Sequence, residues 1–250
     1  MAARDAFSCW AQALGNCSGG PSREHIISKS QFDDDQITVE GLPWCKEPKT
    51  VGLASLVAKN LCVHHNTALS PADAEAKRLK DGLSAIYHKP VLPVRLRLDA
   101  RLIERWLLKT TINLALQEPG SGIDLSDEIV RRAFGLSSTP RSQGFFAIAE
   151  LAEQQTYQTS IRFESFMRSK DGRLVLGGFN VHGWRALYAF EGAPPAVGGL
   201  RIRGWNYAQH WLRFRWNPDL EPGDTVMPAV IYGEDGTPNI QPRGQIAGAA

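Results

Sequence analysis

The sequence predicts an α+β protein from three observations. Apolar residues recur at helical spacing between residues 98 and 117, and Ser70 is suited to begin a helix. After Pro140 the texture changes to short alternating runs separated by turn signals, which is typical of antiparallel strands. All four cysteines lie in the first quarter of the chain, which favours an N-terminal ββα module clipped by zinc. We expect three parts: that module at 1–89, a helical packing region at 90–140 and a β-rich domain of unassigned role at 141–250.

Two pairs of candidate metal ligands bracket the first quarter of the chain. Cys9 and Cys17 are joined by a glycine-containing segment that can fold the two thiolates towards one point. Cys62 and His65 form a second pair with Cys-x-x-His spacing. Structural zinc takes four nitrogen or sulfur ligands, usually as two pairs that each come from a turn. We therefore expect these four side chains to hold a structural Zn²⁺ ion.

The ligand set has two open alternatives. Cys45 can replace Cys9 or Cys17, or it can remain a buried free thiol. His64 can exchange roles with His65, its neighbour in the sequence. The spacing alone does not choose among these sets.

The segment after the first cysteine pair is expected to be a strand followed by an irregular excursion. The β-branched run 26–27 favours an extended conformation, and Glu24 and His25 lie at its start on opposite faces. Residues 33–44 carry an acidic run and turn-forming residues, which predict a solvated loop before order resumes at Val51.

A helix is expected to complete the N-terminal unit. Residues 52–61 fit a short helix or a strand, because periodicity does not distinguish the two over so short a run. Ser70 is suited to cap a helix with Pro71 at its first position, so we expect a helix from there towards Ala85. A zinc ion at the two ligand pairs would pin this helix against the strand that begins at Glu24.

Two further helices and several strands are expected downstream. A helix should begin at the cap Asp99 and stop before Pro119, and a shorter one should cover about residues 126–134. The dipeptide Asp171-Gly172 is a hairpin signal. Expected strands are at 161–164, 174–176, 186–190, 200–203 and 211–216.

Bulk composition restricts the class of protein but not its partners. The chain has 250 residues, of which 43% are hydrophobic and 22% charged, with a formal net charge of +2. Such a charge makes no electrostatic case for nucleic acid or membrane. The sequence shows no apolar leader and no uncharged apolar run near the ~20 residues that span a bilayer. We expect a cytoplasmic protein with no membrane contact.

Arginine and aromatic residues alternate in the β-rich part. Between residues 158 and 220 there are nine Lys/Arg against four Asp/Glu, interleaved with tryptophan and tyrosine. Such a surface can grip phosphates and stack on bases. An ordinary sheet with one apolar face and one solvated arginine face gives the same pattern, so both interpretations stand.

The first quarter of the chain resembles the HNH (ββα-metal) endonucleases. The resemblance rests on Glu24-His25-Ile26-Ile27 followed by Leu61-Cys62-x2-His65-Asn66, and it covers roughly residues 7–85. In that family a zinc knuckle is structural, and a separate hydrolytic ion, often magnesium or manganese, lies between the first strand and the helix. The later histidine of the family is absent here.

The resemblance implies a role for each matching residue. His25 matches the general base that activates water, and Asn60 is the candidate for the asparagine that orients this base. Glu24 and Asn66 match ligands of the hydrolytic Mg²⁺ or Mn²⁺ ion, with Asn66 also a catalytic candidate, and Asp73 can complete the site. A histidine that titrates near neutral pH and a hard cation with oxygen ligands suit phosphodiester hydrolysis.

The sequence thus predicts a metal-dependent endonuclease that cuts DNA. The DNA is expected to be double-stranded, and a homodimer is one way in which the protein could cut both strands. A non-catalytic zinc-containing module that binds nucleic acid is the alternative. A scaffold whose β region recognises another protein is the third interpretation.

Overall fold

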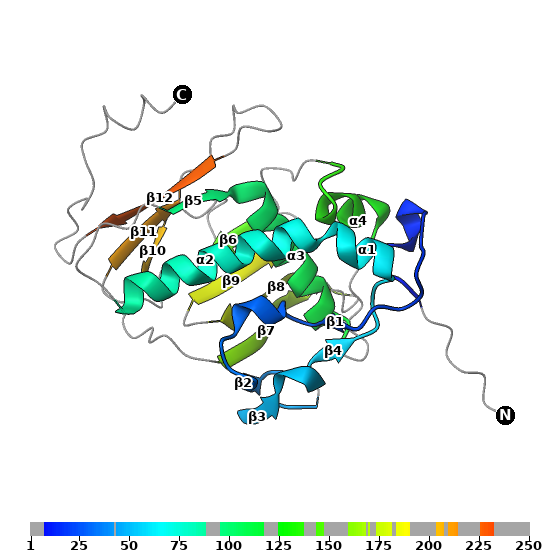
Figure 1. Cartoon of the computed structure of the whole chain (residues 1–250), viewed down its shortest axis with the longest axis horizontal. Helices are drawn as coiled ribbons and strands as arrows, with labels where there is room; N and C mark the ends of the chain where they lie inside the picture. Colours follow the sequence, from blue (N-terminus) through cyan, green and yellow to red (C-terminus); the bar gives the residue numbers. More distant parts are fainter. Residues whose placement is uncertain are drawn as a thin grey trace.

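The computed structural model in Figure 1 is a mixture of helices and small sheets, in agreement with the predicted α+β class. It describes residues 8–42, 44–88, 96–117, 125–137, 144–147, 160–168, 170, 174–181, 184–190, 204–207, 210–214 and 226–232. The helices are α1 (Val63–Ala68), α2 (Ser70–His88), α3 (Ala100–Ala115) and α4 (Asp127–Ala133), with short 3-10 turns η1 (Gln12–Leu14), η2 (Lys29–Gln31) and η3 (Leu53–Ser55). The strands are β1 (Glu24–His25), β2 (Gln36–Glu40), β3 (Lys49–Gly52), β4 (Val57–Ala58), β5 (Leu96–Asp99), β6 (Gly144–Ala147), β7 (Ser160–Arg168), β8 (Leu174–Val181), β9 (Trp184–Ala189), β10 (Gly204–Tyr207), β11 (His210–Phe214) and β12 (Val226–Tyr232).

The N-terminal unit consists of a two-stranded antiparallel ladder, whose strands are separated in the chain by β2 and β3, followed by two helices. β1 pairs antiparallel with β4, with Glu24 opposite Ala58 and His25 opposite Val57. α1 and α2 follow in direct succession. The helix expected from Ser70 is confirmed and runs beyond its expected end. Residues 52–61, which fitted either a helix or a strand, contain η3 and then β4.

The helix start predicted at the cap Asp99 is confirmed, and so is the shorter helix expected at about residues 126–134. The Asp99 carboxylate accepts hydrogen bonds from the backbone N–H groups of Arg101 and Leu102 at the start of α3. The Ser126 hydroxyl accepts one from the backbone N–H of Ile129 at the start of α4. Each cap satisfies backbone donors that have no partner within their own helix.

β2 belongs to a six-stranded sheet, although its residues were expected to form a loop. The strand order is β3-β2-β7-β8-β9-β6, in which β2 and β7 are parallel and the other neighbours antiparallel. The prediction of a loop over residues 33–44 was wrong for this strand. Ile37 and Val39 alternate with more exposed residues and are 1% and 0% exposed, so their burial outweighs the acidic run before them.

The later strands follow the expected texture, and four strands are additions to it. β7, β8, β9 and β11 overlap four of the expected runs, whereas the fifth, residues 200–203, lies outside the described part. β10, β11, β12 and β5 form an antiparallel four-stranded sheet. The strands that the sequence did not predict are β5, β6, β10 and β12.

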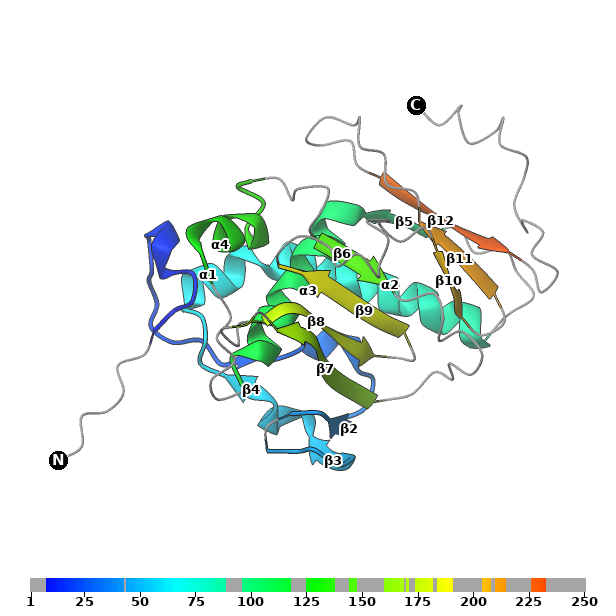
Figure 2. The same cartoon turned by 180° about the vertical axis from the view of Figure 1, so that it is seen from behind.

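α3 lies between α2 and the six-stranded sheet. It packs on α2 from one side and on β6, β8 and β9 from the other, and Figure 2 shows the sheet in front of it. Its Trp106 is 0% exposed and meets the ring of Phe179 edge to face, with centroids 5.6 Å apart. α3 therefore joins the N-terminal unit to the sheet. Among the described residues, no helix has both the length and the apolar character needed to cross a membrane.

Gly41 permits the close approach of β2 to β7, which leads to a stability prediction. Gly41 has φ +79°, and a Cβ there would overlap the carbonyl oxygen of Phe163. We expect Gly41→Ala to lower the free energy of unfolding by about 2–5 kcal/mol, from a left-handed backbone penalty and the steric overlap together. Denaturant unfolding monitored by tryptophan fluorescence measures this loss.

Gly52→Ala is the matched control. Gly52 has φ −68°, and a Cβ there would meet nothing within 4 Å. Its replacement should change the free energy of unfolding by less than about 0.5 kcal/mol. Equal effects of the two substitutions would contradict the close approach of the two strands.

Candidate metal centre

Cys9, Cys17, Cys62 and His65 gather at one point. Their four ligand atoms all lie within 4.8 Å of one another, and every residue of the set except Cys17 is buried. The Nδ1 atom of His65 is 3.4, 3.5 and 3.2 Å from the sulfur atoms of Cys9, Cys17 and Cys62. A tetrahedral zinc ion with ordinary bond lengths sets sulfur and nitrogen ligands about 3.5 Å apart. The donor set and its spacing therefore fit zinc.

The local backbone explains how the ligands converge. Cys62 caps α1, and its sulfur accepts a hydrogen bond from the backbone N–H of His65 at 3.4 Å. The Cys9 sulfur accepts one from the backbone N–H of Cys62, also at 3.4 Å. Between Cys9 and Cys17 the chain turns through Gly15 and Asn16, which have φ +75° and +56°. The first cysteine pair is thereby folded back onto the start of α1.

The structure decides between the open ligand sets. The Cys45 sulfur donates to the carbonyl oxygens of Val39 at 3.3 Å and Glu47 at 3.2 Å, and Cys45 is not part of the four-residue cluster. It is the buried free thiol that the sequence allowed as an alternative. His65 rather than His64 faces the sulfur atoms.

Thiols this close favour a bound cation. Burial and the adjacent Cys9 and Cys62 together raise the pKa of the Cys17 thiol to about 11. Several thiolates in one place repel one another, whereas a zinc ion stabilises all of them as ligands. Metal binding at such a site stabilises the folded state directly.

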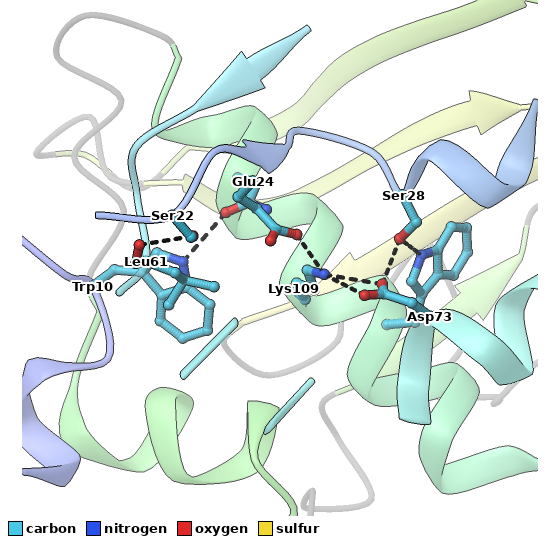
Figure 3. Close-up of polar contacts among 9 residues, drawn as sticks. Trp10, Ser22, Glu24, Ser28, Leu61, Asp73 and Lys109 are labelled. Carbon is cyan, nitrogen blue, oxygen red and sulfur yellow. Dashed lines mark hydrogen bonds and ion pairs between the residues drawn. The ribbon is translucent and has the colours of Figure 1, made fainter. Parts of the chain in front are cut away.

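A second polar cluster joins β1, α2 and α3. The ammonium nitrogen of Lys109 lies 2.5 Å from Oε1 of Glu24 and 2.9 and 2.8 Å from the two carboxylate oxygens of Asp73. Figure 3 shows the two carboxylates converging on this ammonium group. The Ser28 hydroxyl donates to Asp73 and accepts from the indole N–H of Trp106 at 2.9 Å.

This cluster is deeply buried. The side chains of Lys109 and Glu24 are 2% and 5% exposed, and that of Asp73 is 25% exposed. Burial raises the pKa of Glu24, the adjacent Lys109 lowers it and Asp73 raises it, so the net direction is upwards. A buried carboxylate is costly unless it is paired. Lys109 supplies the pairing charge to both acids.

The other candidate residues lie around these two clusters. His25 is half-buried on the face of β1 opposite Glu24, and burial, Lys29, Arg23 and Lys109, in that order, lower its pKa. Asn66 is half-buried on α1. The side-chain nitrogen of Asn60 is buried with no hydrogen-bond partner among the described residues, and the backbone carbonyl oxygen of Asn60 accepts from the backbone N–H of Trp10. The assignments of Glu24, Asn66 and Asp73 to a hydrolytic ion and of His25 and Asn60 to catalysis stay predictions.

The sequence analysis did not identify Lys109 as part of the site. The feature of the sequence that could have indicated it is a lysine inside the apolar run of the helix at 98–117, next to residues expected to be buried.

Comparison with family models, curated proteins and solved structures finds no match to the chain. The function is therefore inferred from the geometry of the two clusters.

The zinc assignment predicts the metal content of the purified protein. We expect one zinc ion per chain by mass spectrometry, and its loss from Cys62→Ser because that variant removes a ligand that also caps α1. Cys45→Ser is the matched control and should keep its zinc, since Cys45 is outside the cluster. Zinc retained by Cys62→Ser, or lost from Cys45→Ser, would contradict the ligand set.

The cationic surroundings of His25 predict its titration. Its pKa should lie below the usual 6.5, so the imidazole is neutral at pH 7. Lys29→Gln removes a repelling positive charge and should raise this pKa towards 6.5, as measured by proton NMR of the imidazole. Lys77→Gln, on the exposed side of α2, is the control and should leave it unchanged. A fall in the pKa of His25 in the Lys29→Gln variant would contradict this electrostatic explanation.

Proposed function

We propose that the chain is an endonuclease of the HNH type that hydrolyses phosphodiester bonds in DNA, with His25 as the general base. The observation that supports this proposal is an antiparallel pair of short strands and a helix held by a Cys3His cluster, with a half-buried histidine on the first strand. This is the arrangement that the resemblance to the HNH endonucleases implies.

The surroundings of His25 suit a base that acts on a phosphodiester. A neutral imidazole can accept a proton from water, and the low pKa of His25 keeps it in that form at neutral pH. The positive charges of Arg23 and Lys29 lie near it and are borne by exposed residues. They attract the phosphate backbone and stabilise the negative charge that develops on the reacting phosphate.

The two metal roles differ in how well the residues fit them. A zinc ion at the Cys3His cluster would supply structural stability and no chemistry. The expected Mg²⁺ or Mn²⁺ ion does not fit between Glu24 and Asp73, because the ammonium of Lys109 already contacts both carboxylates. The proposed role of His25 is therefore independent of an ion at this pair.

A second function is favoured by the same lysine. If the site between strand and helix carries an ammonium in place of a hydrolytic ion, the unit can serve as a zinc-stabilised module that binds nucleic acid without cutting it. This function predicts salt-sensitive DNA binding that survives Glu24→Gln and His25→Ala, because the affinity then comes from phosphate contacts.

Plasmid nicking tests the first function. Zinc-loaded protein should convert supercoiled plasmid to the open circle, measured in parallel with Mg²⁺, with Mn²⁺ and with no added divalent ion. His25→Ala should slow nicking by about 100-fold or more, the usual effect of removing a general base. His64→Ala is the matched control, since His64 is exposed and outside the metal cluster.

The outcomes separate the two functions. Equal nicking by wild type and His25→Ala would reject His25 as the base. Salt-sensitive binding with no nicking under any of the three conditions would reject the endonuclease and support the binding module. The absence of both binding and nicking would reject both functions.

A further inference from the structure

The contacts of Lys109 account for every proton of its ammonium group. An ammonium has three N–H donors. The three oxygen atoms around this one are Oε1 of Glu24 and both carboxylate oxygens of Asp73, at 2.5, 2.9 and 2.8 Å. The lysine therefore has no donor left for substrate, and its side chain is 2% exposed. Its role is confined to the two carboxylates.

The surroundings hold this lysine in place. Lys109 lies three residues after Trp106 on α3, so the two side chains project from the same face of the helix. Trp106 donates to Ser28, and Ser28 donates to the same carboxylate that Lys109 contacts. The ammonium is thus fixed by a helix that is itself packed between α2 and the six-stranded sheet.

From these contacts we infer that Lys109 is the resident cation of the Glu24–Asp73 pair and excludes a divalent ion from it. The pair lies between the first strand and the helix, where the resemblance to the ββα-metal fold leads one to expect the hydrolytic ion. A Mg²⁺ or Mn²⁺ ion binds oxygen ligands with several waters and needs room for them. The buried ammonium fills that place and neutralises one of the two negative charges.

The inference can be tested without DNA, so its outcome is independent of nuclease activity. Lys109→Ala leaves two buried carboxylates and an open space, whereas Lys109→Met leaves the same charges but fills the space. The zinc-loaded full chain would be titrated with Mn²⁺, with bound ion counted from the electron paramagnetic resonance signal of free Mn²⁺. Thermal unfolding and zinc content report the fold of each variant.

We expect wild type to bind no more Mn²⁺ than Asp73→Asn. Lys109→Ala should bind one additional Mn²⁺ ion, about tenfold or more tightly than the background binding that wild type shares with Asp73→Asn, and Mn²⁺ should raise its unfolding temperature. Lys109→Met and the double variant Lys109→Ala/Asp73→Asn should show no such gain, because the first lacks space and the second lacks a ligand.

Two results would overturn the inference. One is a Mn²⁺ ion that wild type binds and Asp73→Asn does not. The other is a folded Lys109→Ala that binds no more Mn²⁺ than Lys109→Met. If Lys109→Ala folds only when Mn²⁺ is added, this rescue supports the inference. If it does not fold even then, the comparison of wild type with Asp73→Asn decides alone.

Discussion

The pairing of Lys109 with Glu24 and Asp73 is the interaction on which the arrangement of the N-terminal unit depends. It connects β1, α2 and α3 through the buried charges of Lys109 and Glu24 and the partly exposed charge of Asp73. Removing one partner of a buried ion pair typically costs about 3–5 kcal/mol, because the remaining charge is left without compensation. A large part of the stability of a domain can thus depend on one amino group.

The Cys3His cluster complements this pairing at the other end of the N-terminal unit. β1 and β4 are each two residues long, and so short a ladder is not stable alone. The metal ligands hold the segment before β1 against the start of α1, while Lys109 holds β1 against α2 and α3. His65 also packs on Phe134 beside α4, with ring centroids 5.3 Å apart. Two long-range clusters therefore supply the order that the short strands cannot.

Sequence reasoning succeeded where the signal was local. The helix start at Asp99 follows from capping chemistry within three residues, and the metal cluster follows from ligand type and spacing. It did not find β2, whose alternating apolar residues were obscured by acidic and turn-forming neighbours. Nor did it find the partner of Glu24, because that lysine is far away in the chain and reaches it only through the packing of α3. The exclusion of Cys45 from the cluster likewise depends on tertiary structure.

The parallel pairing of β2 with β7 has a consequence for how the chain acquires its structure. Residues 38–40 hydrogen-bond to residues 160–162, so the sheet has a high contact order and forms only after the distant strand has emerged from the ribosome. Until then β2 has one unpaired edge, which can pair with strands of other chains. A fragment that ends after α2 would keep this edge exposed. Translation rate and chaperone capture are thus expected to matter more for this protein than for one built from local contacts.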